Sequence, residues 1–576
     1  EAKQKRKVNS EIMNSLNKII KIISFVIIPV GILLFFNQLD LQGNDFKQAI
    51  ISTVAALIGM IPEGLVLLTS TVLAVSVTRL AKKKVLVQEL YCIETLARVD
   101  VLCLDKTGTI TEGRMTVDKI IQYNDCKENE LKEILGSLGK YSEDKNSTIE
   151  AVREKFTSNK ELKVIARMPF KSANKWSGIS FEDITYVLGA PEVIGNTPKD
   201  IEKYISEYRV VAIGKSKEKI VDKLPSNIEI VGYILISDVI RKNSKEILEY
   251  FDKQGVAIKL ISGDNPITVS NIAKKAGVKD YENYIDARTF KTIEELREAA
   301  TKYTIFGRVT PEQKKEIILA LKEEKHTVAM TGDGVNDVLA LKNADCSISV
   351  ANGSDAARNV SQLVLMDSDF KSMPNIVDEG RRTINNIQRS ATLFLVKTIY
   401  ATILAVLFVF INMPYPFIPI QLTLINLVVT GIPSVILALE PNKERIKGKF
   451  IINVIKRALP TALTVVTNII IIGIISSIYN LDELNYSSVC VVVTAITGFI
   501  LLFKISRPFN LSRGILFVGV VTIFTLGISL FRDLFSIRLD ASNIVAIVIL
   551  GITSIFVGVL YNFIANRIFK VIEKRL

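Results

Sequence analysis

The chain has 576 residues, of which 49% are hydrophobic and 23% are charged, and its formal net charge is +13. This composition is too apolar for a purely soluble protein and too charged for one buried entirely in a membrane. It predicts a protein that is part membrane and part cytosolic. The five cysteines have no CxxC spacing, which argues against both a disulfide framework and a zinc site.

Apolar runs of about 20 residues, the length that crosses a bilayer core, recur in two blocks of the chain. They lie at 19–36, 48–76, 391–411, 416–438, 457–479, 487–503, 514–531 and 543–564. One or two of these runs would also fit buried core helices, but so many runs of this length favour about eight membrane spans. No cleavable signal peptide is recognised, because the first run follows a charged lead and is long enough to span.

The distribution of charge predicts the orientation in the membrane. Lys and Arg gather in the lead at 1–7 and again at 79–84 and 441–449, whereas connections such as 37–45 and 412–417 are neutral or acidic. The positive-inside tendency then places both ends of this chain and the large insertion between the two apolar blocks in the cytosol. We expect the protein to lie in the plasma membrane. Topology accounts for the basic net charge, so no nucleic-acid partner is needed.

The insertion, from about 80 to 385, alternates strand-like and helix-like patterns. The run "RVDVLCLD" predicts a buried strand that ends at Asp105, and strands at 256–261 and 326–330 lead into "SGDN" and "TGDGVND". Reactive groups collect beyond the carboxyl ends of parallel strands. We therefore expect one sheet edge, joined by a helix start in 306–321, to carry Asp105, Ser262, Lys314, Asp333, Asn336 and Asp337.

These residues predict phosphoryl transfer. Asp105 alone would fit an ordinary turn, but four converging segments favour a site. A carboxylate attacks a polyanionic phosphate only when that charge is neutralised, and Asp333 beside Asp105 supplies a second oxygen ligand for Mg²⁺. The expected product is an aspartyl-phosphate. The same edge offers ammonium and hydroxyl groups from Lys106, Lys314, Thr107 and Ser262.

Four motifs resemble the signature set of P-type ATPases: "DKTGT" from residue 105, "TGDGVND" from residue 331, "DVIR" from residue 238 and "IPEGL" from residue 61. The resemblance covers nearly the whole chain. It implies a cytosolic haloacid-dehalogenase-like domain, a doubly wound parallel sheet, at 85–111 and 227–375. A nucleotide-binding α+β domain is inserted at 112–226. An α-helical membrane bundle is expected at 1–84, after a cytosolic lead, with spans resembling the third and fourth, and at 376–576 with spans resembling the fifth to tenth.

The resemblance also implies roles and the cofactors ATP and Mg²⁺. Asp105 would take the γ-phosphate of ATP, and Mg²⁺ would be held by Asp105, the Thr107 carbonyl and Asp333. The groups implied to hold the phosphate are those of Thr107, Ser262, Lys314 and Asn336, with Asp337 behind them.

The stretch "PFKSANKWSG" at 169–178 resembles the family's adenine-binding segment. The likeness implies that Phe170 stacks on the base and that Lys175 approaches it, although alone these residues would also fit a core phenylalanine and a solvated face. Leu188 departs from the usual lysine of the family. The implied polyphosphate and ribose contacts are Arg209, Asp264 and Arg308.

No Thr-Gly-Glu tripeptide occurs in these residues, whereas the family's actuator domain carries one in the loop that hydrolyses the phosphoenzyme. We expect a fragment of a longer pump without its N-terminal actuator region. Such a chain should become phosphorylated without efficient turnover.

Two classes of function remain open: an ATP-driven pump, and a phosphotransferase tethered to an inert membrane anchor. Pro62 and Glu63 lie deep inside a predicted span. A proline there frees backbone carbonyls, and intramembrane carboxylates are functional by default. These residues favour the pump. The absence of a Cys-Pro-Cys sequence argues against export of a soft metal.

The cargo is predicted from the spans. Calcium takes six to eight oxygen ligands, several of them carboxylates, and the spans resembling the family's site offer one acid, Glu63. Lys397 either extends to the cytosolic surface or faces Glu63 as a counter-ion. We therefore expect a proton, a monovalent cation, an organic cation or a lipid head group rather than calcium. The matching neutral positions are Thr398, Asn426 and Thr430.

Overall fold

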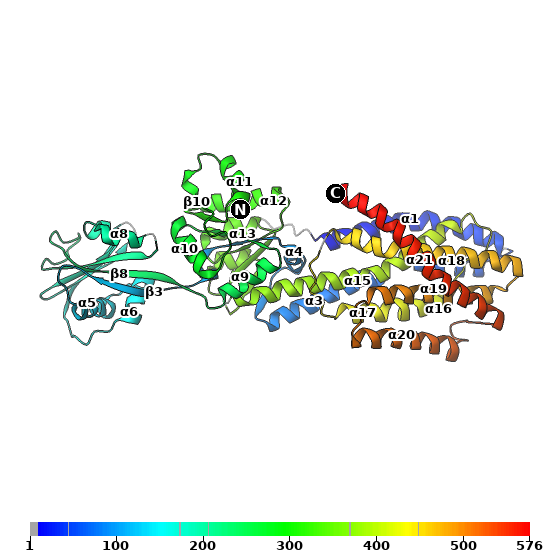
Figure 1. Ribbon diagram of the computed structural model, residues 1–576. Coiled ribbons are helices and arrows are strands. Elements are labelled where there is room, and N and C mark those ends of the chain that lie inside the picture. The colour runs from blue at the N-terminus through cyan, green and yellow to red at the C-terminus, as the bar shows by residue number, and fades with distance from the viewer. Residues whose placement is uncertain are drawn as a thin grey trace. The chain divides into compact units, whose positions relative to one another are not determined.

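The computed structural model describes residues 10–43, 45–171, 174–205, 207–367, 370–446 and 448–575, so the basic lead at 1–7 lies outside the described residues. The chain divides into two units (Figure 1). A helical unit comprises Glu1–Leu80, Ile93–Arg98 and Ile376–Leu576, and an α/β unit comprises Ala81–Cys92 and Val99–Asn375.

The first sheet of the α/β unit has eight strands in the order β1-β14-β13-β12-β2-β9-β11-β10. Its strands are β1 (Val85–Val87), β2 (Val101–Leu104), β9 (Ala257–Ile261), β10 (Tyr284–Asp286), β11 (Ile305–Gly307), β12 (Val328–Thr331), β13 (Cys346–Val350) and β14 (Leu363–Leu365). All neighbours are parallel except β1 and β14. The three predicted strands are therefore β2, β9 and β12, and they are neighbours.

The helices of this region are α9 (Ser244–Lys253), α10 (Pro266–Ala276), α11 (Ile293–Lys302), α12 (Pro311–Glu323), α13 (Val338–Asn343) and α14 (Asp355–Val360). The short helix α4 (Cys92–Arg98), which precedes β2 in the chain, belongs to the helical unit from Ile93 onward. Leu296, Ile317 and Leu341 from α11, α12 and α13 pack with Val101 and Met330 of the sheet in one buried cluster. This burial fixes the sheet edge from which the polar loops emerge.

The second sheet is antiparallel, in the order β3-β8-β7-β6-β5-β4. Its strands are β3 (Thr111–Gln122), β4 (Val164–Lys171), β5 (Trp176–Phe181), β6 (Thr185–Gly189), β7 (Arg209–Ser216) and β8 (Glu229–Ile240), accompanied by α5 (Glu128–Tyr141), α6 (Ser147–Lys155), α7 (Pro191–Ile194) and α8 (Lys199–Ile205). Because β8 pairs with β3 from Thr111↔Ile240 to Gln122↔Gly232, this sheet extends beyond the predicted insertion at 112–226. A local sequence pattern predicts a strand but not the sheet to which it belongs.

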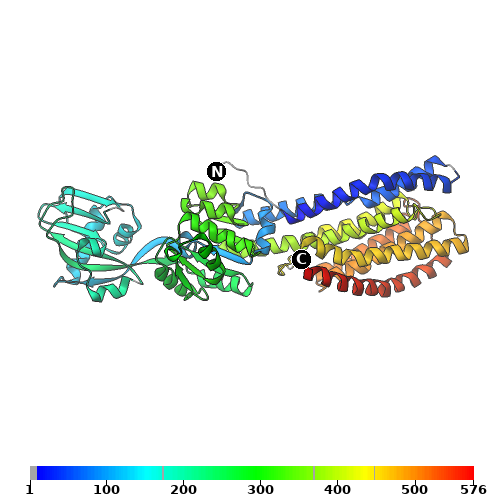
Figure 2. The same cartoon turned by 90° about the horizontal axis from the view of Figure 1, so that it is seen from above.

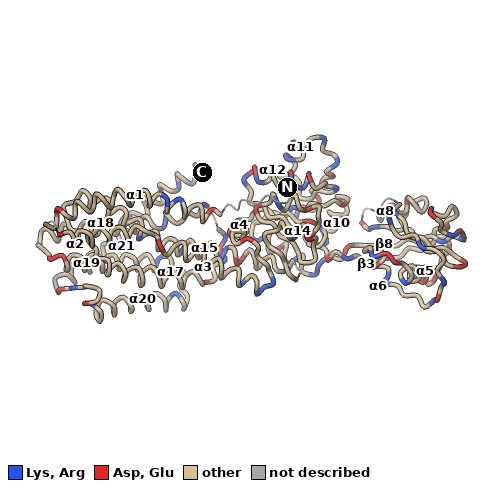
Figure 3. The backbone as a smooth tube through the Cα atoms, turned by 180° about the vertical axis from the view of Figure 1, so that it is seen from behind, with Lys and Arg blue, Asp and Glu red and all other residues tan. Residues whose placement is uncertain are grey.

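Among the described residues of the helical unit, eight helical segments are long and apolar enough to span a membrane, which confirms the predicted number. They are Glu11–Leu41, Phe46–Lys82, Phe370–Leu407, Pro419–Ala438, Phe450–Tyr479, Glu483–Ile505, Leu511–Leu530 and Asn543–Ile572. The first is α1, the second contains α2 and α3, the third joins η4 (Phe370–Ser372) to α15 (Met373–Leu407), and the fourth contains α16, η5 and α17. The last four lie in α18 (Phe450–Tyr479), α19 (Glu483–Ile505), α20 (Leu511–Leu530) and α21 (Ala541–Arg575). These segments all run side by side (Figure 2), with charged residues gathered toward their ends (Figure 3).

Two of these segments are irregular. The second is broken between α2 (Phe46–Met60) and α3 (Glu63–Lys82), where Ile61 is extended with φ −85° and ψ 123°. Pro62 lacks an N–H group and disfavours a helical conformation at the residue before it, which explains the break. The fourth contains a π-helical segment, η5 (Ile425–Gly431), between α16 (Pro419–Leu424) and α17 (Ile432–Ala438). Such interruptions leave backbone groups available to a ligand.

We predict that Gly307→Ala destabilises the α/β unit. A Cβ atom at Gly307 would lie 2.5 Å from the N and Cα atoms of Pro266, and backbone atoms at the start of α10 have little room to move. Overpacking of this kind lowers the free energy of unfolding by about 1–3 kcal/mol. The midpoint of thermal unfolding of the purified protein measures this loss of stability. Gly263→Ala is the matched control, since its nearest neighbour would be 4.0 Å away; equal midpoints for the two variants would contradict the prediction.

Candidate active site

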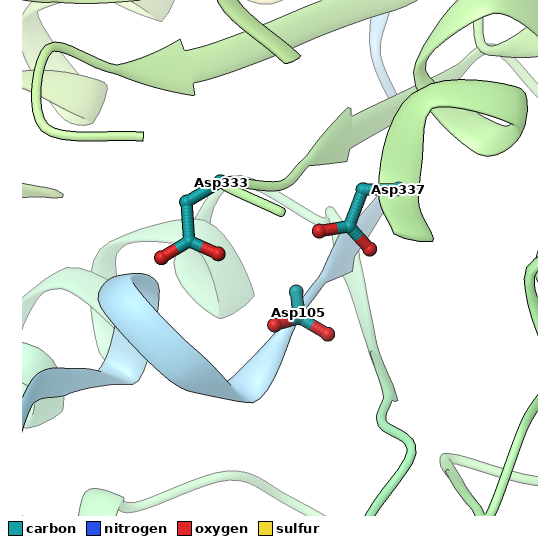
Figure 4. Close-up of side chains that lie close together, drawn as sticks. All are labelled: Asp105, Asp333 and Asp337. Carbon is teal, nitrogen blue, oxygen red and sulfur yellow. The ribbon is translucent and has the colours of Figure 1, made fainter. Parts of the chain in front are cut away.

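Three aspartates converge at the carboxyl edge of the eight-stranded sheet. Asp105 follows β2, Asp333 follows β12, and Asp337 ends the short turn η3 (Val335–Asp337). Their carboxylate oxygens lie within 4.8 Å of one another (Figure 4). Because β2 and β12 pair in register, Leu104 opposite Thr331, the two loops leave the sheet at the same level. The predicted convergence is therefore observed.

Lys314 compensates the negative charge of this cluster. It lies in the first turns of α12, and its Nζ atom is 2.7 Å from Asp105 Oδ1 and 2.6 Å from Asp337 Oδ1. Burial raises the pKa of Asp105 to about 6, Lys314 opposes that rise, and Asp337 adds to it. Burial by itself would lower the pKa of Lys314, but the two carboxylates outweigh burial and raise that pKa above its ordinary value. The ammonium group is therefore charged at neutral pH.

Lys106 is held by a different pair of carboxylates. Its Nζ atom is 2.7 Å from Asp238 Oδ2, on β8, and 2.5 Å from Asp264 Oδ2, in the loop after β9. The sequence placed Lys106 among the catalytic groups and Asp264 among the nucleotide contacts, but it gave no sign that the two form an ion pair. The pair joins the "DKTGT", "DVIR" and "SGDN" segments, which are distant in the chain.

Gly108 allows the loop after Asp105 to approach Asp333. Its φ angle is +70°, and a Cβ atom there would lie 2.1 Å from Asp333 Oδ2. The loop is fixed by Arg241, which donates a hydrogen bond of 3.0 Å to the Gly108 carbonyl, and by Ser244, whose hydroxyl donates to the Ile110 carbonyl at 3.1 Å. The Thr107 N–H donates to Asp105 Oδ2 at 3.2 Å.

The donor set at this edge fits a magnesium ion. Asp105 and Asp333 supply hard carboxylate oxygens, which Mg²⁺ prefers, and Lys314 contacts Asp105 and Asp337 but not Asp333 in the described hydrogen bonds. Burial, followed by the charge of Asp337, raises the pKa of Asp333. A cation beside Asp333 would relieve that unfavourable charge.

The other predicted phosphate contacts lie on loops at the same edge. Thr107 is exposed in η1 (Lys106–Ile110), the buried Ser262 follows β9 directly, and Asn336 is exposed in η3. Close contacts thus join four residues into one cluster: Asp105, Asp333, Asp337 and Lys314. The other three groups lie on loops that leave the same edge of the sheet.

A cavity of about 380 Å³ lies in the six-stranded sheet region, and Phe170, Lys175 and Arg209 all line it. Leu188 also lines it, so the position that departs from the family's lysine contributes an apolar wall. Arg308 is elsewhere: it belongs to the eight-stranded sheet region, where its guanidinium is 3.2 Å from Asp286 Oδ2 and its N–H donates to the Asp264 carbonyl.

One wall of this cavity was not predicted from the sequence. The residues concerned are Asn146, Ser147 and Thr148, at the start of α6. The Asn146 side chain accepts a hydrogen bond from the Ile149 N–H and caps the helix. A capping residue before a helical pattern was the available signal, but it predicts a helix start and not a pocket.

In the helical unit, Lys397 faces Glu63. Their Nζ and Oε1 atoms are 3.6 Å apart, and the Lys397 side chain is 6% exposed whereas that of Glu63 is 63% exposed. This geometry favours the counter-ion over extension to the surface, the two alternatives left open by the sequence. Thr398 Oγ1 and Asn426 Oδ1 are buried without a hydrogen-bond partner in the described part of the chain. Asn426 and Thr430 both belong to η5.

Comparisons with known proteins agree with this architecture. Residues 99–345 match the model of the haloacid dehalogenase-like hydrolase family. The chain is 42% identical over 536 residues to the probable cation-transporting ATPase exp7 of Streptococcus pneumoniae, covering 90% of this chain and 69% of that protein. It is also 38% identical over 562 residues to the calcium-transporting ATPase CtpE of Mycobacterium tuberculosis, covering 93% of this chain and 70% of that protein.

The chain belongs to the cation-transporting P-type ATPases. As a P-type ATPase it is an integral membrane protein that couples ATP to cation transport through an aspartyl-phosphate intermediate. The helical bundle and the haloacid-dehalogenase-like sheet are the fold that the sequence predicted. P-type ATPases and haloacid-dehalogenase-like hydrolases in general use ATP and Mg²⁺, respectively, which agrees with the expected cofactors.

For this P-type ATPase we predict that Gly108→Ala prevents phosphorylation. The new methyl group would displace the Asp333 carboxylate and would strain a backbone with positive φ. The phosphoenzyme formed from radiolabelled ATP should fall by at least about tenfold, the effect of a change of about 1.4 kcal/mol in the barrier. Equilibrium ATP binding should stay near the parent value, because the residues predicted to contact the base line a cavity in the other sheet region. Parent-like phosphorylation would contradict the prediction.

Proposed function

We propose that Asp105 is the residue that accepts the γ-phosphoryl group of ATP. One Asp105 oxygen attacks the γ-phosphorus, the bond from that phosphorus to the bridging oxygen of ADP breaks, and ADP leaves. The observation that carries this proposal is the contact of Lys314 with both Asp105 and Asp337 beside Asp333. A buried carboxylate without such a cation would bind protons rather than attack a phosphate.

The surrounding groups then have separate tasks. Asp105, the Thr107 carbonyl and Asp333 would hold Mg²⁺, which when bound neutralises phosphate charge. Thr107, Ser262 and Asn336 donate hydrogen bonds to the phosphoryl oxygens. Asp337 acts through Lys314, whose ammonium it holds toward Asp105. Lys106 fixes the loop after Asp105 through Asp238 and Asp264.

The cavity in the six-stranded sheet region is our candidate for the nucleotide site. Its volume of about 380 Å³ and its combination of apolar walls with a few cations are typical of small-molecule sites. Phe170 would stack on the base, Lys175 would approach the base, and Arg209 would contact the ribose and the polyphosphate. Asp264 and Arg308 remain proposed contacts of the polyphosphate on the eight-stranded sheet region.

We propose that Glu63 is the centre of the cation site and that Lys397 is a counter-ion displaced by the cargo. The helix break at Pro62 frees carbonyl oxygens next to Glu63, and the unpaired Thr398 and Asn426 oxygens, together with Thr430, supply neutral ligands. The expected location is the plasma membrane, with the α/β unit cytosolic, as the basic clusters suggest.

Two cargoes have specific support. The name of the Mycobacterium relative favours calcium, against the expectation from the sequence. The charge at the site favours a proton or a monovalent cation, because Lys397 already neutralises Glu63 and calcium sites usually gather several carboxylates.

We predict that Asp333→Asn abolishes Mg²⁺-dependent phosphorylation and leaves ATP binding largely intact. The substitution removes one anionic ligand at the phosphoryl site without touching the cavity. Phosphoenzyme from radiolabelled ATP is measured against free Mg²⁺, with Asp105→Asn as the variant that lacks the acceptor. Phosphorylation of Asp333→Asn at the parent level would remove the metal assignment, and phosphorylation of Asp105→Asn would remove the acceptor.

A second prediction concerns the cargo. Phosphoenzyme formation should be stimulated by the transported cation, and Glu63→Gln should lower the apparent affinity for that cation by about tenfold or more, since one lost charge interaction is of that size. Lys397→Met should raise the affinity, because no ammonium group then competes. Stimulation is compared for calcium, protons and monovalent cations in turn. If no cation stimulates the parent protein in a Glu63-dependent way, the proposed site is wrong.

A further inference from the structure

The wall of the nucleotide cavity that carries Phe170 is irregular. Strand β4 is one of the two edge strands of the six-stranded sheet, and it pairs with β5 through Met168↔Gly178 and Lys171↔Trp176. Pro169 and Phe170 therefore lie together opposite one residue, Ser177, which is a β-bulge. Bulges beside functional sites redirect a side chain, and they persist only if their backbone groups find other partners.

Asp144 is the partner of this bulge. The Phe170 N–H donates to the Asp144 carboxylate, at 3.0 Å from Oδ1 and 3.2 Å from Oδ2. Pro169 has no N–H group, so the Phe170 N–H is the bulge's single backbone donor. A hydrogen bond to a carboxylate is stronger than one between neutral groups. The contact therefore fixes the backbone at the residue whose ring lines the cavity.

Asp144 is itself held in place. It belongs to the loop between α5 and α6, and its N–H donates to Ser142 Oγ at 3.2 Å. Arg153 Nη2 donates to the carbonyls of Ser142 and Asp144 at 3.0 and 3.4 Å. Arg167, on β4, donates from Nε to the Tyr141 carbonyl at 3.0 Å. The carboxylate is thus presented by a loop that is fixed from both α6 and β4.

The same loop leads directly into the other wall of the cavity. Asn146 caps α6 two residues after Asp144, and Asn146, Ser147 and Thr148 line the cavity together with Phe170. Asp144 does not line that cavity itself; it lines the smaller cavity next to it. Asp144 would therefore affect a bound nucleotide indirectly, by fixing the position of Phe170 and the distance between the Phe170 wall and the wall at the start of α6.

We propose that Asp144 is a positioning residue of the nucleotide site, which holds the β4 bulge so that the Phe170 ring faces the base. The inference rests on the proposed nucleotide site. Asp144 is a partly buried loop residue, and it lies far along the chain from "PFKSANKWSG". Neither feature by itself suggests an effect on ATP affinity.

The test is ATP binding to the full chain, by calorimetry, together with the ATP dependence of phosphorylation. Phe170→Ala should weaken ATP binding by about tenfold, the usual effect of losing one stacked base. Asp144→Ala should weaken it by about three- to tenfold and raise the KM for ATP equally, with the phosphoenzyme level at saturating ATP unchanged. Asp144→Asn retains a carbonyl acceptor and should stay within about twofold of the parent protein.

Glu143→Ala is the matched control, since it removes the neighbouring carboxylate, which pairs with Arg167 at 3.2 Å and does not bond to Phe170. It should bind ATP like the parent protein. Asp144→Ser, whose hydroxyl is too short to reach the Phe170 N–H, gives the same comparison if the alanine variant does not fold.

The double variant Asp144→Ala with Phe170→Ala separates positioning from general stability. If Asp144 acts through the ring, the double variant binds ATP no more weakly than Phe170→Ala alone. Two results would overturn the inference and leave the nucleotide site in place. One is a double variant in which the losses of ATP affinity from the two single substitutions multiply, and the other is an Asp144→Ala variant that binds ATP like Glu143→Ala. A Phe170→Ala variant with parent-like affinity would instead remove the nucleotide site, and the inference with it.

Discussion

The α/β unit depends on the contact of one ammonium group with two buried carboxylates. Asp105 and Asp337 lie with Asp333 within 4.8 Å, an arrangement that repulsion would prevent without a cation. Lys314 reaches both because α12 begins at the right place: Thr310 and Gln313 form a reciprocal cap, and Pro311 occupies the first turn. The contact of Lys314 with the aspartates therefore depends on three local features: the cap of α12, the register of β2 with β12, and the positive φ of Gly108.

The second sheet serves a different requirement. The proposed nucleotide site needs a cavity with a rigid aromatic wall, and an edge strand can supply one because its outer N–H groups are free to bond elsewhere. The Phe170 N–H bonds to Asp144 and not to a neighbouring strand. In the proposed scheme, phosphoryl chemistry and nucleotide binding are built on separate sheets that β3 and β8 join, so a change in one need not disturb the other.

Much of this arrangement was predictable. Strands β2 and β12 are buried along their whole length, and β9 is buried over its last three residues despite Lys259. The polar residues directly after these parallel strands were therefore expected to meet at one edge. The partners of Lys106, the length of β8 and the hydrogen bond between Phe170 and Asp144 were not predictable, because each depends on residues far apart in the chain. Asp144 and Phe170 are a clear case: neither "SEDKN" nor "MPFK" carries any sign of the other. The sequence placed Lys397 near Glu63 only as one of two alternatives, and the pairing was decided by packing.

In the proposed cation site, the charge at Glu63 limits which cargo can bind. Glu63 and Lys397 together carry no net charge, so a proton or a monovalent cation bound beside both leaves one uncompensated positive charge, and calcium leaves two. In a region of low dielectric each such charge is costly. Neutral oxygens from Thr398, Asn426 and the carbonyls freed at Pro62 reduce that cost but do not cancel it. A divalent cargo therefore requires the Lys397 ammonium to move away from Glu63 or to lose its proton, whereas a proton requires only that Glu63 accept it. The position of one lysine side chain, more than the number of oxygen ligands, separates the two kinds of cargo.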